Sequence, residues 1–430
     1  MATNGNWQIR PLGAVAELCL GKMLDQKKNR GEPLPYLANI NVRWGEFELE
    51  NLRTMRFEPK EIERYGLRFG DIVMCEGGEP GRCAIWKNQV PGMMIQKALH
   101  RIRASQLLDH RFLFYSFLHI GQSRGFDPFF TGATIYHLPL EKLAKVEVPV
   151  PPLPVQRRIA GILSAYDELI ENSQRRIRIL ETMARALYRE WFVHFRFPGH
   201  ETHPRVPSPL GDIPQGWEVR PLESLMADHI GGGWGKDTAD DNHTNPAWVI
   251  RGTDIPDARS SQVKNVPHRY HTQSNLRSRK LAAGDILFEV SGGSKGQPVG
   301  RTLLITPELM SAFDGDVICA SFCKRIRPNA ASYGAELLYL SFLEAYESGE
   351  IERFQVQSTG ISNFKWTEYI AKTERVIPPE PLRSRFREQV VPLFAQIAML
   401  GLQIQNLRRT RNLLLPRLLS GQVELEGCNG

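Results

Sequence analysis

The sequence lacks the features that mark secreted, membrane-spanning and metal-binding proteins. Six cysteines are scattered over 430 residues, and none forms the Cys-x-x-Cys pair used by zinc sites and redox motifs. We therefore predict reduced, structural thiols and no metal site. No uncharged apolar run is long enough to cross a bilayer, and residues 1–6 lack the apolar core of a signal peptide. We expect a cytoplasmic protein that does not enter a membrane.

Sequence patterns of catalysis are also missing. Asn245-Pro-Ala-Trp248 comes nearest to the active motif of an amino-methyltransferase, but alanine replaces its second proline. Gly231-Gly-Gly-Trp-Gly-Lys236 resembles a phosphate-binding loop, but it is one residue too short, and Asp237 stands where serine or threonine belongs. We interpret both segments as turns or loops. The sequence predicts a chain with no catalytic residues and no cofactor of its own.

A moderate excess of positive charge is present. The chain has 54 lysines and arginines against 47 aspartates and glutamates, which gives a net charge of +7. This balance is compatible with a polyanionic partner such as nucleic acid, although many proteins without such a partner are equally basic. The length is enough for two to four domains.

The most informative feature is an internal repeat. Five landmarks of the first half return in the same order in the second, at an offset that drifts only from 210 to 228. The paired landmarks are Trp7-Gln-Ile-Arg-Pro-Leu12 and Trp217-Glu-Val-Arg-Pro-Leu222; Leu67-Arg-Phe-Gly-Asp-Ile-Val73 and Leu281-Ala-Ala-Gly-Asp-Ile-Leu287; Gly77-Gly78 with Gly81-Arg82 and Gly292-Gly293 with Gly300-Arg301; Thr131-Gly132 and Thr359-Gly360; Val150-Pro-Pro152 and Ile377-Pro-Pro379. The chain is therefore predicted to be a tandem duplication.

Each half begins with a mixed region of short strands, glycine turns and few helices. The Gly-Asp pairs of the landmarks precede apolar runs, which predicts a turn that enters a buried strand. Helices are predicted near 109–122 and 335–348. Prolines then end the mixed region of each half and precede a long helix.

The two long helices have matching apolar seams. Their steps alternate between four and three residues, which is the spacing of a coiled coil, and the seams align at a constant offset of 227. The first seam is Ile159, Leu163, Tyr166, Ile170, Ser173, Ile177, Leu180, Ala184, Leu187 and Trp191; the second is Phe386, Val390, Leu393, Ile397, Leu400, Ile404, Leu407, Arg411, Leu414 and Leu418. Neither helix can bury such a seam alone, so we predict that the two pair with each other.

The predicted fold class is α+β: a duplicated mixed α/β domain followed each time by a long helix. Because the halves are duplicates, pseudo-two-fold symmetry makes the helix pair an antiparallel coiled coil. Helices of this length would provide a spacer of roughly 55 Å at ~1.5 Å per residue. The predicted segments are residues 1–150, a first domain; 151–198, a central helix; 199–216, a proline-rich linker; 217–377, a second domain; and 378–425, a C-terminal helix.

With this plan the sequence resembles the specificity subunits of type I restriction–modification systems, from Trp7 to about Leu425. The resemblance rests on an ordered, doubled set of motifs. They are Gly70-Asp-Ile-Val73, Gly77-Gly78 with Gly81-Arg82, Thr131-Gly132 leading into His137-Leu138, Val148-Pro-Val-Pro-Pro-Leu153 with Gln156, Arg189-Glu-Trp-Phe-Val193 with Phe195, Ile213-Pro-Gln-Gly-Trp217, and Leu413-Leu-Leu-Pro416 with Leu418-Leu-Ser-Gly421. His194 departs from the acidic residue that many members have there.

The resemblance implies a non-catalytic subunit with two target recognition domains, each reading half of a split double-stranded DNA site. It implies two modification subunits that use S-adenosylmethionine to methylate adenine. It also implies restriction subunits that translocate DNA and require ATP and magnesium. The long helices would separate the half-sites and bind these partners.

Candidate DNA-binding residues are polar side chains on predicted loops around the repeated motifs. Phosphate contacts outnumber base contacts in protein–DNA interfaces, so most of them are expected to position rather than to specify. In the first domain they are Lys22, Asn41, Arg43, Arg82, Lys97, Thr131, Thr134 and His137; in the second they are Lys236, Arg251, Lys295, Arg301, Thr359, Ser362, Asn363 and Lys365. The segments between the landmarks differ most, which predicts two different half-sites.

Three alternatives stay open at this stage. The arginines of the two Gly-Arg pairs could brace a turn instead of binding DNA. The aromatic cluster Trp191, Phe192, Phe195 and Phe197 is either core or a surface for a partner. The same duplicated frame would also suit a stand-alone DNA-binding protein such as a repressor, and an enzyme with an unrecognised site is the remaining class.

Overall fold

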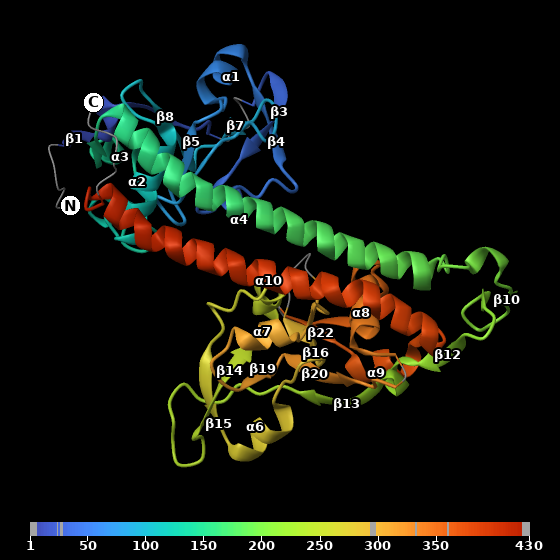
Figure 1. Ribbon diagram of the computed structural model, residues 1–430. Helices are drawn as coiled ribbons and strands as arrows, with labels where there is room; N and C mark the ends of the chain where they lie inside the picture. Colours follow the sequence, from blue (N-terminus) through green and yellow to red (C-terminus); the bar gives the residue numbers. More distant parts are fainter. Residues whose placement is uncertain are drawn as a thin grey trace. The chain divides into compact units, whose positions relative to one another are not determined.

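The computed structural model describes residues 7–23, 25, 29–292, 298–331, 333–358 and 361–423 (Figure 1). The chain divides into two compact units. The first contains Met1–Leu169 with Leu407–Gly430, and the second contains Ile170–Asn406. Each long helix therefore contributes one part to each unit.

The first unit holds the first repeat. Its elements are β1 (Gln8–Pro11), β2 (Ala16–Leu20), β3 (Glu32–Leu37), β4 (Arg53–Phe57), α1 (Pro59–Tyr65), β5 (Ile72–Cys75), β6 (Cys83–Ile85), β7 (Met94–Ile95), β8 (Leu99–Ala104), α2 (His110–Gln122), α3 (Leu140–Leu143), β9 (Glu147–Val150) and the start of α4 (Leu153–Tyr188). The strands form an antiparallel sheet in the order β2-β8-β5-β6, a sheet β4-β3-β7 in which β3 and β7 are parallel, and the pair β1-β9.

The second unit repeats this plan. Its elements are β10 (Arg205–Val206), β11 (Ile213–Pro214), β12 (Glu218–Pro221), β13 (Met226–Gly231), β14 (Asn245–Ile250), α5 (Ile255–Ala258), β15 (His268–His271), α6 (Gln273–Arg279), β16 (Ile286–Glu289), β17 (Ser291–Gly292), β18 (Thr302–Leu304), α7 (Pro307–Ser311), β19 (Val317–Cys319), β20 (Cys323–Pro328), α8 (Ala335–Glu347), β21 (Gln355–Ser358), β22 (Ile361–Phe364), α9 (Trp366–Lys372), β23 (Glu374–Ile377) and the start of α10 (Glu380–Leu419). The sheets are β13-β20-β16-β18, β15-β14-β19 and the pair β12-β23, with β17-β22-β21 in addition.

The shared topology confirms the duplication and explains its first and last landmarks. In the first unit Gln8 pairs with Val150, and in the second Glu218 pairs with Ile377, so the strand that opens each domain closes on the strand that ends it. The expected strands after the Gly-Asp pairs are present as β5 and β16, and every residue of both is buried. The expected helices near 109–122 and 335–348 are α2 and α8.

The segment Asn245–Trp248, which we interpreted as a turn, is already part of strand β14. Its backbone pairs with β15 on one side and, from Trp248, with β19 on the other. The proline at position 246 does not end the strand, because β14 pairs there with only one neighbour.

The start of α4 and the end of α10 pack together in the first unit. Ile159, Leu163, Leu415 and Leu418 belong to one hydrophobic core with α2. Asp167 forms an ion pair with Arg411. The residue numbers on α4 rise as those on α10 fall, so the helices are antiparallel here.

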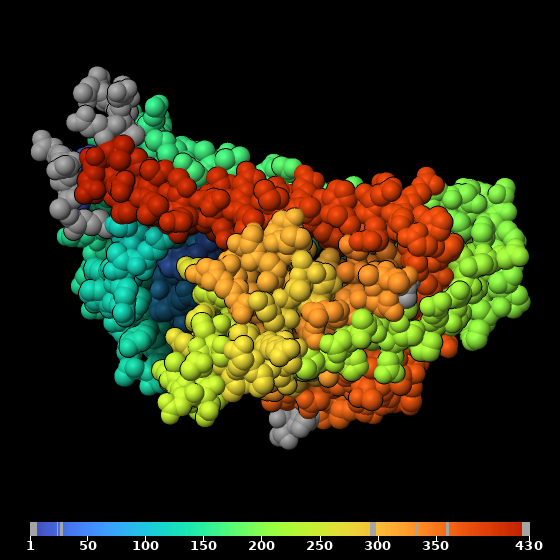
Figure 2. Space-filling model, turned by 60° about the horizontal axis from the view of Figure 1, so that its bottom comes forward, coloured from blue at the N-terminus to red at the C-terminus, as the bar shows by residue number. Residues whose placement is uncertain are grey.

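The second unit shows the same orientation at the other ends of the helices. Phe386 of α10 lies against Tyr188 of α4 and against Trp191 and Phe192 after it, with ring centroids 6.4, 5.5 and 4.7 Å away. All seam residues named above are buried or half-buried. The predicted antiparallel pairing of the two helices is thus confirmed, and the other side of α10 remains at the surface (Figure 2).

Length and composition alone would allow α10 to cross a membrane. Its seam, however, packs on α4 and on the cores of both units. This is the packing of a core helix and not of a membrane span.

The aromatic cluster after α4 is core. Trp191, Phe192 and Phe197 are buried, and Phe197 packs against Trp217 with ring centroids 5.3 Å apart. The segment 199–216 is a folded connection, since β10 and β11 pair within it. The predicted proline-rich linker thus contains a short antiparallel strand pair of its own.

Candidate nucleic-acid interface

Three loops meet at one corner of the first repeat. They are Glu76-Gly77 after β5, Lys97-Ala98 before β8, and the segment 131–137. The Glu76 amide donates to the Ala98 carbonyl (2.9 Å), and the Leu138 amide donates to the Glu76 carbonyl (2.7 Å). Thr131 and His137 exchange both backbone hydrogen bonds, at 2.8 and 2.9 Å. We call this set of three loops the first corner.

The first corner carries both polar and apolar side chains at its surface. Ile135 and Tyr136 are 64% and 54% exposed, which is unusual for large apolar residues at adjacent positions. Lys97 and Thr134 are exposed, and His137 Nδ1 lies 3.1 Å from Glu76 Oε2. The corner thus offers a cation, hydroxyls and apolar groups on a backbone fixed by hydrogen bonds.

The second repeat builds the equivalent corner from Val290–Gly292, the turn at Phe322 and strand β22. The Val290 amide donates to the Phe322 carbonyl (2.9 Å), and the Phe364 amide donates to the Val290 carbonyl (2.8 Å). Ser291 Oγ also bonds Asn363 Oδ1 at 2.7 Å. We call this the second corner.

The two corners share a frame but not their side chains. Glu76 and Val290 make matching backbone hydrogen bonds in the two corners. Ala98 is therefore equivalent to Phe322, and His137, which precedes Leu138, is equivalent to Asn363, which precedes Phe364. Phe322 is 58% exposed and Ile361 is 44% exposed. The two repeats thus carry different surface groups on a common backbone frame.

Of the candidate residues, Lys97, Thr131, Thr134 and His137 lie at the first corner, and Ser362, Asn363 and Lys365 lie at or next to the second. Lys365 Nζ is 3.4 Å from Glu368. The two remaining candidates close to these loops in sequence, Lys295 and Thr359, lie outside the described residues.

Lys22 is not a surface residue. It is 4% exposed, and its Nζ donates to the Arg56 carbonyl (2.8 Å) and to Glu61 Oε2 (2.6 Å). Burial raises the pKa of Glu61, but the hydrogen bonds from Lys22 and from the Glu58 amide outweigh this and lower it overall. Lys22 therefore stabilises the first domain, and its assignment to a DNA-binding loop is corrected.

Two further candidates in the first domain support local backbone. Asn41 accepts from the Ala38 amide (2.9 Å) and donates to the Glu48 carbonyl (3.0 Å), and Arg43 binds Glu48 through two bonds of 2.9 Å. Asn41 is therefore occupied within its turn, whereas Arg43 remains 38% exposed beside an exposed partner.

The Gly-Arg pairs brace turns in both repeats. Gly81 and Gly300 have φ of +90° and +115°, and a Cβ there would come within 2.8 Å of Phe126 and 2.5 Å of Ile351. Arg82 donates to Glu79 (2.7 Å) and to the Asn39 carbonyl (3.0 Å), and Arg301 forms a two-pronged pair with buried Glu289. The sequence left open whether these arginines bind DNA or brace a turn, and these contacts favour bracing.

The other candidates of the second domain also have acidic partners. Arg251 binds Asp254 through bonds of 2.9 and 2.7 Å, and it donates to the Asn265 carbonyl. Lys236 is 54% exposed but pairs with Asp240 at 2.5 Å. Hydrogen bonds from Lys236 and from His243 hold the pKa of Asp240 well below its usual value.

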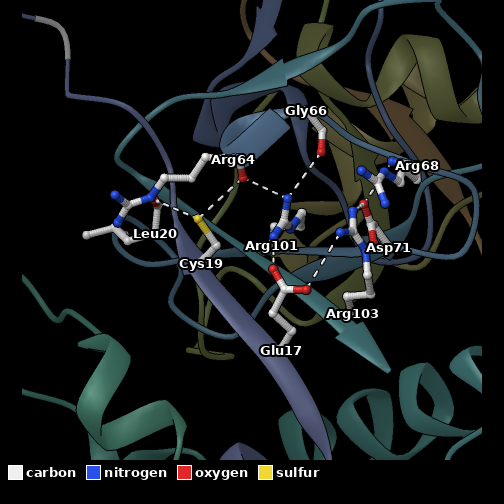
Figure 3. Close-up of polar contacts among 9 residues, drawn as sticks. All are labelled: Glu17, Cys19, Leu20, Arg64, Gly66, Arg68, Asp71, Arg101 and Arg103. Atoms are coloured by element: carbon white, nitrogen blue, oxygen red, sulfur yellow. Dashed lines mark hydrogen bonds and ion pairs between the residues drawn. The ribbon is translucent and has the colours of Figure 1, made fainter. Parts of the chain in front are cut away.

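Sequence reasoning missed an ion-pair network under the sheet of each repeat. In the first, Arg103 binds Asp71 of the Gly-Asp landmark at 2.7 Å, and Arg101 binds Glu17 and the carbonyls of Arg64 and Gly66 (Figure 3). In the second, Arg327 binds Asp285 at 2.8 Å, and Arg325 binds Asp228. The signal that could have revealed it is the Arg-x-Arg pair, Arg101 with Arg103 and Arg325 with Arg327, which follows the Gly-Asp landmark in both halves.

The comparisons with known proteins agree with the fold and with the motifs. The family described as "Type I restriction modification DNA specificity domain" matches residues 4–182. The type I restriction enzyme MjaIX specificity subunit of Methanocaldococcus jannaschii is 24% identical, with 98% of this chain and 94% of the relative covered. The MjaVIII specificity subunit of the same organism is 26% identical over 51% of this chain and 49% of the relative.

A solved structure shares the fold over nearly the whole chain. The type I restriction–modification S subunit from M. genitalium superposes with a TM-score of 0.53 at 14% identity, covering 96% of each chain. The duplicated domains, the paired helices and these matches together identify the chain as a relative of the specificity subunits of type I restriction–modification systems.

Proposed function

We propose that this DNA-recognition specificity subunit binds a split target, with each corner reading one half. The observation that carries the proposal is the repeated frame with different side chains. The first corner presents Lys97, Thr134 and His137, whereas the equivalent surface of the second presents Phe322 and Asn363. Lysine suits the acceptors of guanine, asparagine suits adenine, and apolar groups suit the thymine methyl group, so the half-sites differ in sequence.

The proposal assigns the chemistry to partner chains. Two modification subunits would bind S-adenosylmethionine and methylate adenine, and restriction subunits would use ATP and magnesium to translocate and cut DNA. This chain would contribute recognition and positioning. Resemblance to the family supports this assignment.

Replacing one domain tests independent reading. A chain in which residues 1–150 come from a relative of different specificity should change one half of the methylated motif in the host and preserve the other half. Changes in both halves would contradict independent reading. A chain that copurifies with no methyltransferase, and whose loss leaves the methylome unchanged, would favour the stand-alone repressor.

The antiparallel helices would set the distance between the half-sites. Four residues inserted after Glu181 of α4 would add ~6 Å and turn the following residues by ~40°. DNA rises ~3.4 Å per base pair along one strand. The unspecified spacer of the methylated motif should therefore lengthen by one or two base pairs. An active assembly with an unchanged spacer would show that the helices do not set this distance.

A further inference from the structure

A cleft of about 500 Å³ opens between β2 and α1 in the first repeat. Five basic side chains line it. Arg101 and Arg103 of β8 form its floor, and Lys60, Arg64 and Arg68 of α1 and the turn after it form its rim. Cations outnumber the two lining carboxylates, so the cleft is a basic surface feature.

The floor of the cleft is electrically satisfied. Glu17 pairs with Arg101 and lies 3.7 Å from Arg103, whose other partner is buried Asp71 (Figure 3). Arg101 itself is 2% exposed. These contacts hold β2, β8 and the Gly-Asp turn together, so both arginines of the floor already have acidic partners within the domain.

The rim differs from the floor. Lys60, Arg64 and Arg68 are exposed, and none of them forms a salt bridge with any of the residues that the structure describes. Lys60 and Arg64 are one helical turn apart on α1, about 6 Å along its axis. Three positive charges are therefore gathered at one opening beside the exposed carboxylate of Glu63, and the resulting net positive charge favours an anion there.

The second repeat lacks basic residues at the rim positions, although α6 carries Arg277 and Arg279 at other positions. The floor is repeated there as Arg325 with Asp228 and Arg327 with Asp285. Both α1 and α6 have seven residues, and Leu67 corresponds to Leu281. At that offset the rim positions in the second repeat are Ser274, Ser278 and Ala282.

We propose that the rim binds successive phosphates of the DNA backbone beside the first half-site. This inference rests on the proposed function and names the part of the first domain that follows the backbone. Each cation that neutralises a phosphate releases counterions and adds ~0.9 to the slope of log K against log salt. Backbone contacts carry no sequence information, so the rim sets affinity and position but not the motif.

The test replaces the rim with the residues of the second repeat, as Lys60→Ser, Arg64→Ser and Arg68→Ala in the full-length chain purified with its partner subunits. Duplex DNA that contains the host's methylated motif is titrated at several salt concentrations. The slope should fall by ~2–3, as expected for two or three lost phosphate contacts, and the methylated motif should stay the same. Arg30→Ser, Arg53→Ser and Lys145→Ser remove the same charge from exposed positions of the first domain outside the cleft.

The outcomes are distinct. A slope that falls for the rim variant and not for the control supports the proposal, and the single change Arg64→Ser, with a fall of ~1, guards against misfolding of the triple variant. The proposal is overturned if the rim variant and the wild type have equal slopes. It is also overturned if the slope of the control variant falls as much as that of the rim variant. Inorganic phosphate is added to the wild-type assembly at millimolar concentration and constant ionic strength. If it abolishes DNA binding, the rim is a site for a free anion, and the proposal is overturned. A wild-type assembly without preference for the methylated motif would contradict the proposed function itself.

Discussion

The buried group formed by Tyr115, Asp167 and Arg411 makes a quantitative prediction about the helix pair. Arg411 and Asp167 are 17% and 23% exposed, and Tyr115 Oη donates to Asp167 at 2.6 Å. Burial and the Asp167 charge raise the pKa of Tyr115 strongly, so its hydroxyl remains a donor. Arg411 is one of only two polar residues in the apolar seams, and a single polar residue there can fix the register of a coiled coil.

Arg411→Leu should lower the free energy of unfolding of the first unit by about 2–3 kcal/mol. The change removes one charged hydrogen bond, worth ~1.5–3 kcal/mol, and leaves the Asp167 carboxylate half-buried with only Tyr115 as a donor. For a unit of this size, each kcal/mol corresponds to ~2–4 °C in Tm. Urea titration followed by circular dichroism measures the loss, and Arg409→Leu, an exposed neighbour on α10, should change stability by no more than ~0.5 kcal/mol.

The triple variant Tyr115→Phe, Asp167→Leu and Arg411→Leu decides whether the three groups act together. It removes all three groups of this set at once, so neither the Asp167 nor the Arg411 charge is left half-buried, and such replacements are often neutral or stabilising. We expect stability within ~1 kcal/mol of the wild type, well above that of Arg411→Leu. If the triple variant instead loses the sum of its single losses, the three residues are independent, and the reasoning is wrong.

Three further predictions follow from other contacts. Ile177→Asp places an unpaired carboxylate at a seam position that is 7% exposed, so the chain should fail to form a complex with its partner subunits in size-exclusion chromatography. Ile179 is 52% exposed on the same helix, so Ile179→Asp should be tolerated. Lys22→Met leaves Glu61 without its ammonium partner and should cost the first unit about 2–3 kcal/mol in urea unfolding while the methylated motif stays the same, and a changed motif would contradict the structural role of Lys22. Burial lowers the pKa of His100 from its ordinary value near 6.5, although the Leu138 carbonyl, Glu76 and Glu141 raise it. The imidazole of His100 therefore binds a proton more readily in the unfolded chain than in the folded one, so the free energy of unfolding should fall as the pH drops below 6.5. His100→Gln should make the free energy of unfolding depend less on pH. An unchanged pH profile in this variant would exclude His100 as the source of the pH dependence.

The sequence predicted the parts of this fold that depend on local pattern or on the repeat. The four–three spacing gave the helix pair, and the Gly-Asp pairs gave the entries to β5 and β16. Gln156 shows why some motif residues could not be interpreted in advance. Its side chain accepts from the Asp109 amide (2.8 Å) and donates to the carbonyls of Leu107 and Pro151 (2.9 and 2.7 Å). Gln156 thus joins the starts of α2 and α4. Its partners lie up to 49 residues away in the sequence, so motif spacing could not predict these hydrogen bonds.

The candidate site was harder to predict, because the sequence does not show which cations have partners. Lys22, Arg82 and Arg301 are basic residues near motifs, yet each is held by a carboxylate of its own domain. The partner of Lys22 lies 39 residues away and reaches it only through tertiary packing. Pattern reasoning therefore could not separate basic side chains that have partners in their own domain from those that remain free to bind DNA.

The duplication supplies the information that a single copy would lack. Arg103 and Arg327 occupy equivalent positions and bind equivalent aspartates, so their charge belongs to the scaffold. A cation that both repeats retain with the same partner is explained by the fold they share, whereas an exposed side chain that one repeat alone carries, without a salt bridge, is a candidate for contact with what that repeat binds. Lys60, Arg64 and Arg68 belong to the second kind, and so does the exposed aromatic ring of Phe322, whose equivalent is Ala98. In a protein built from two copies of one frame, the positions that differ while the backbone bonds stay the same are therefore the first places to mutate when testing whether each copy reads its own half of a split target.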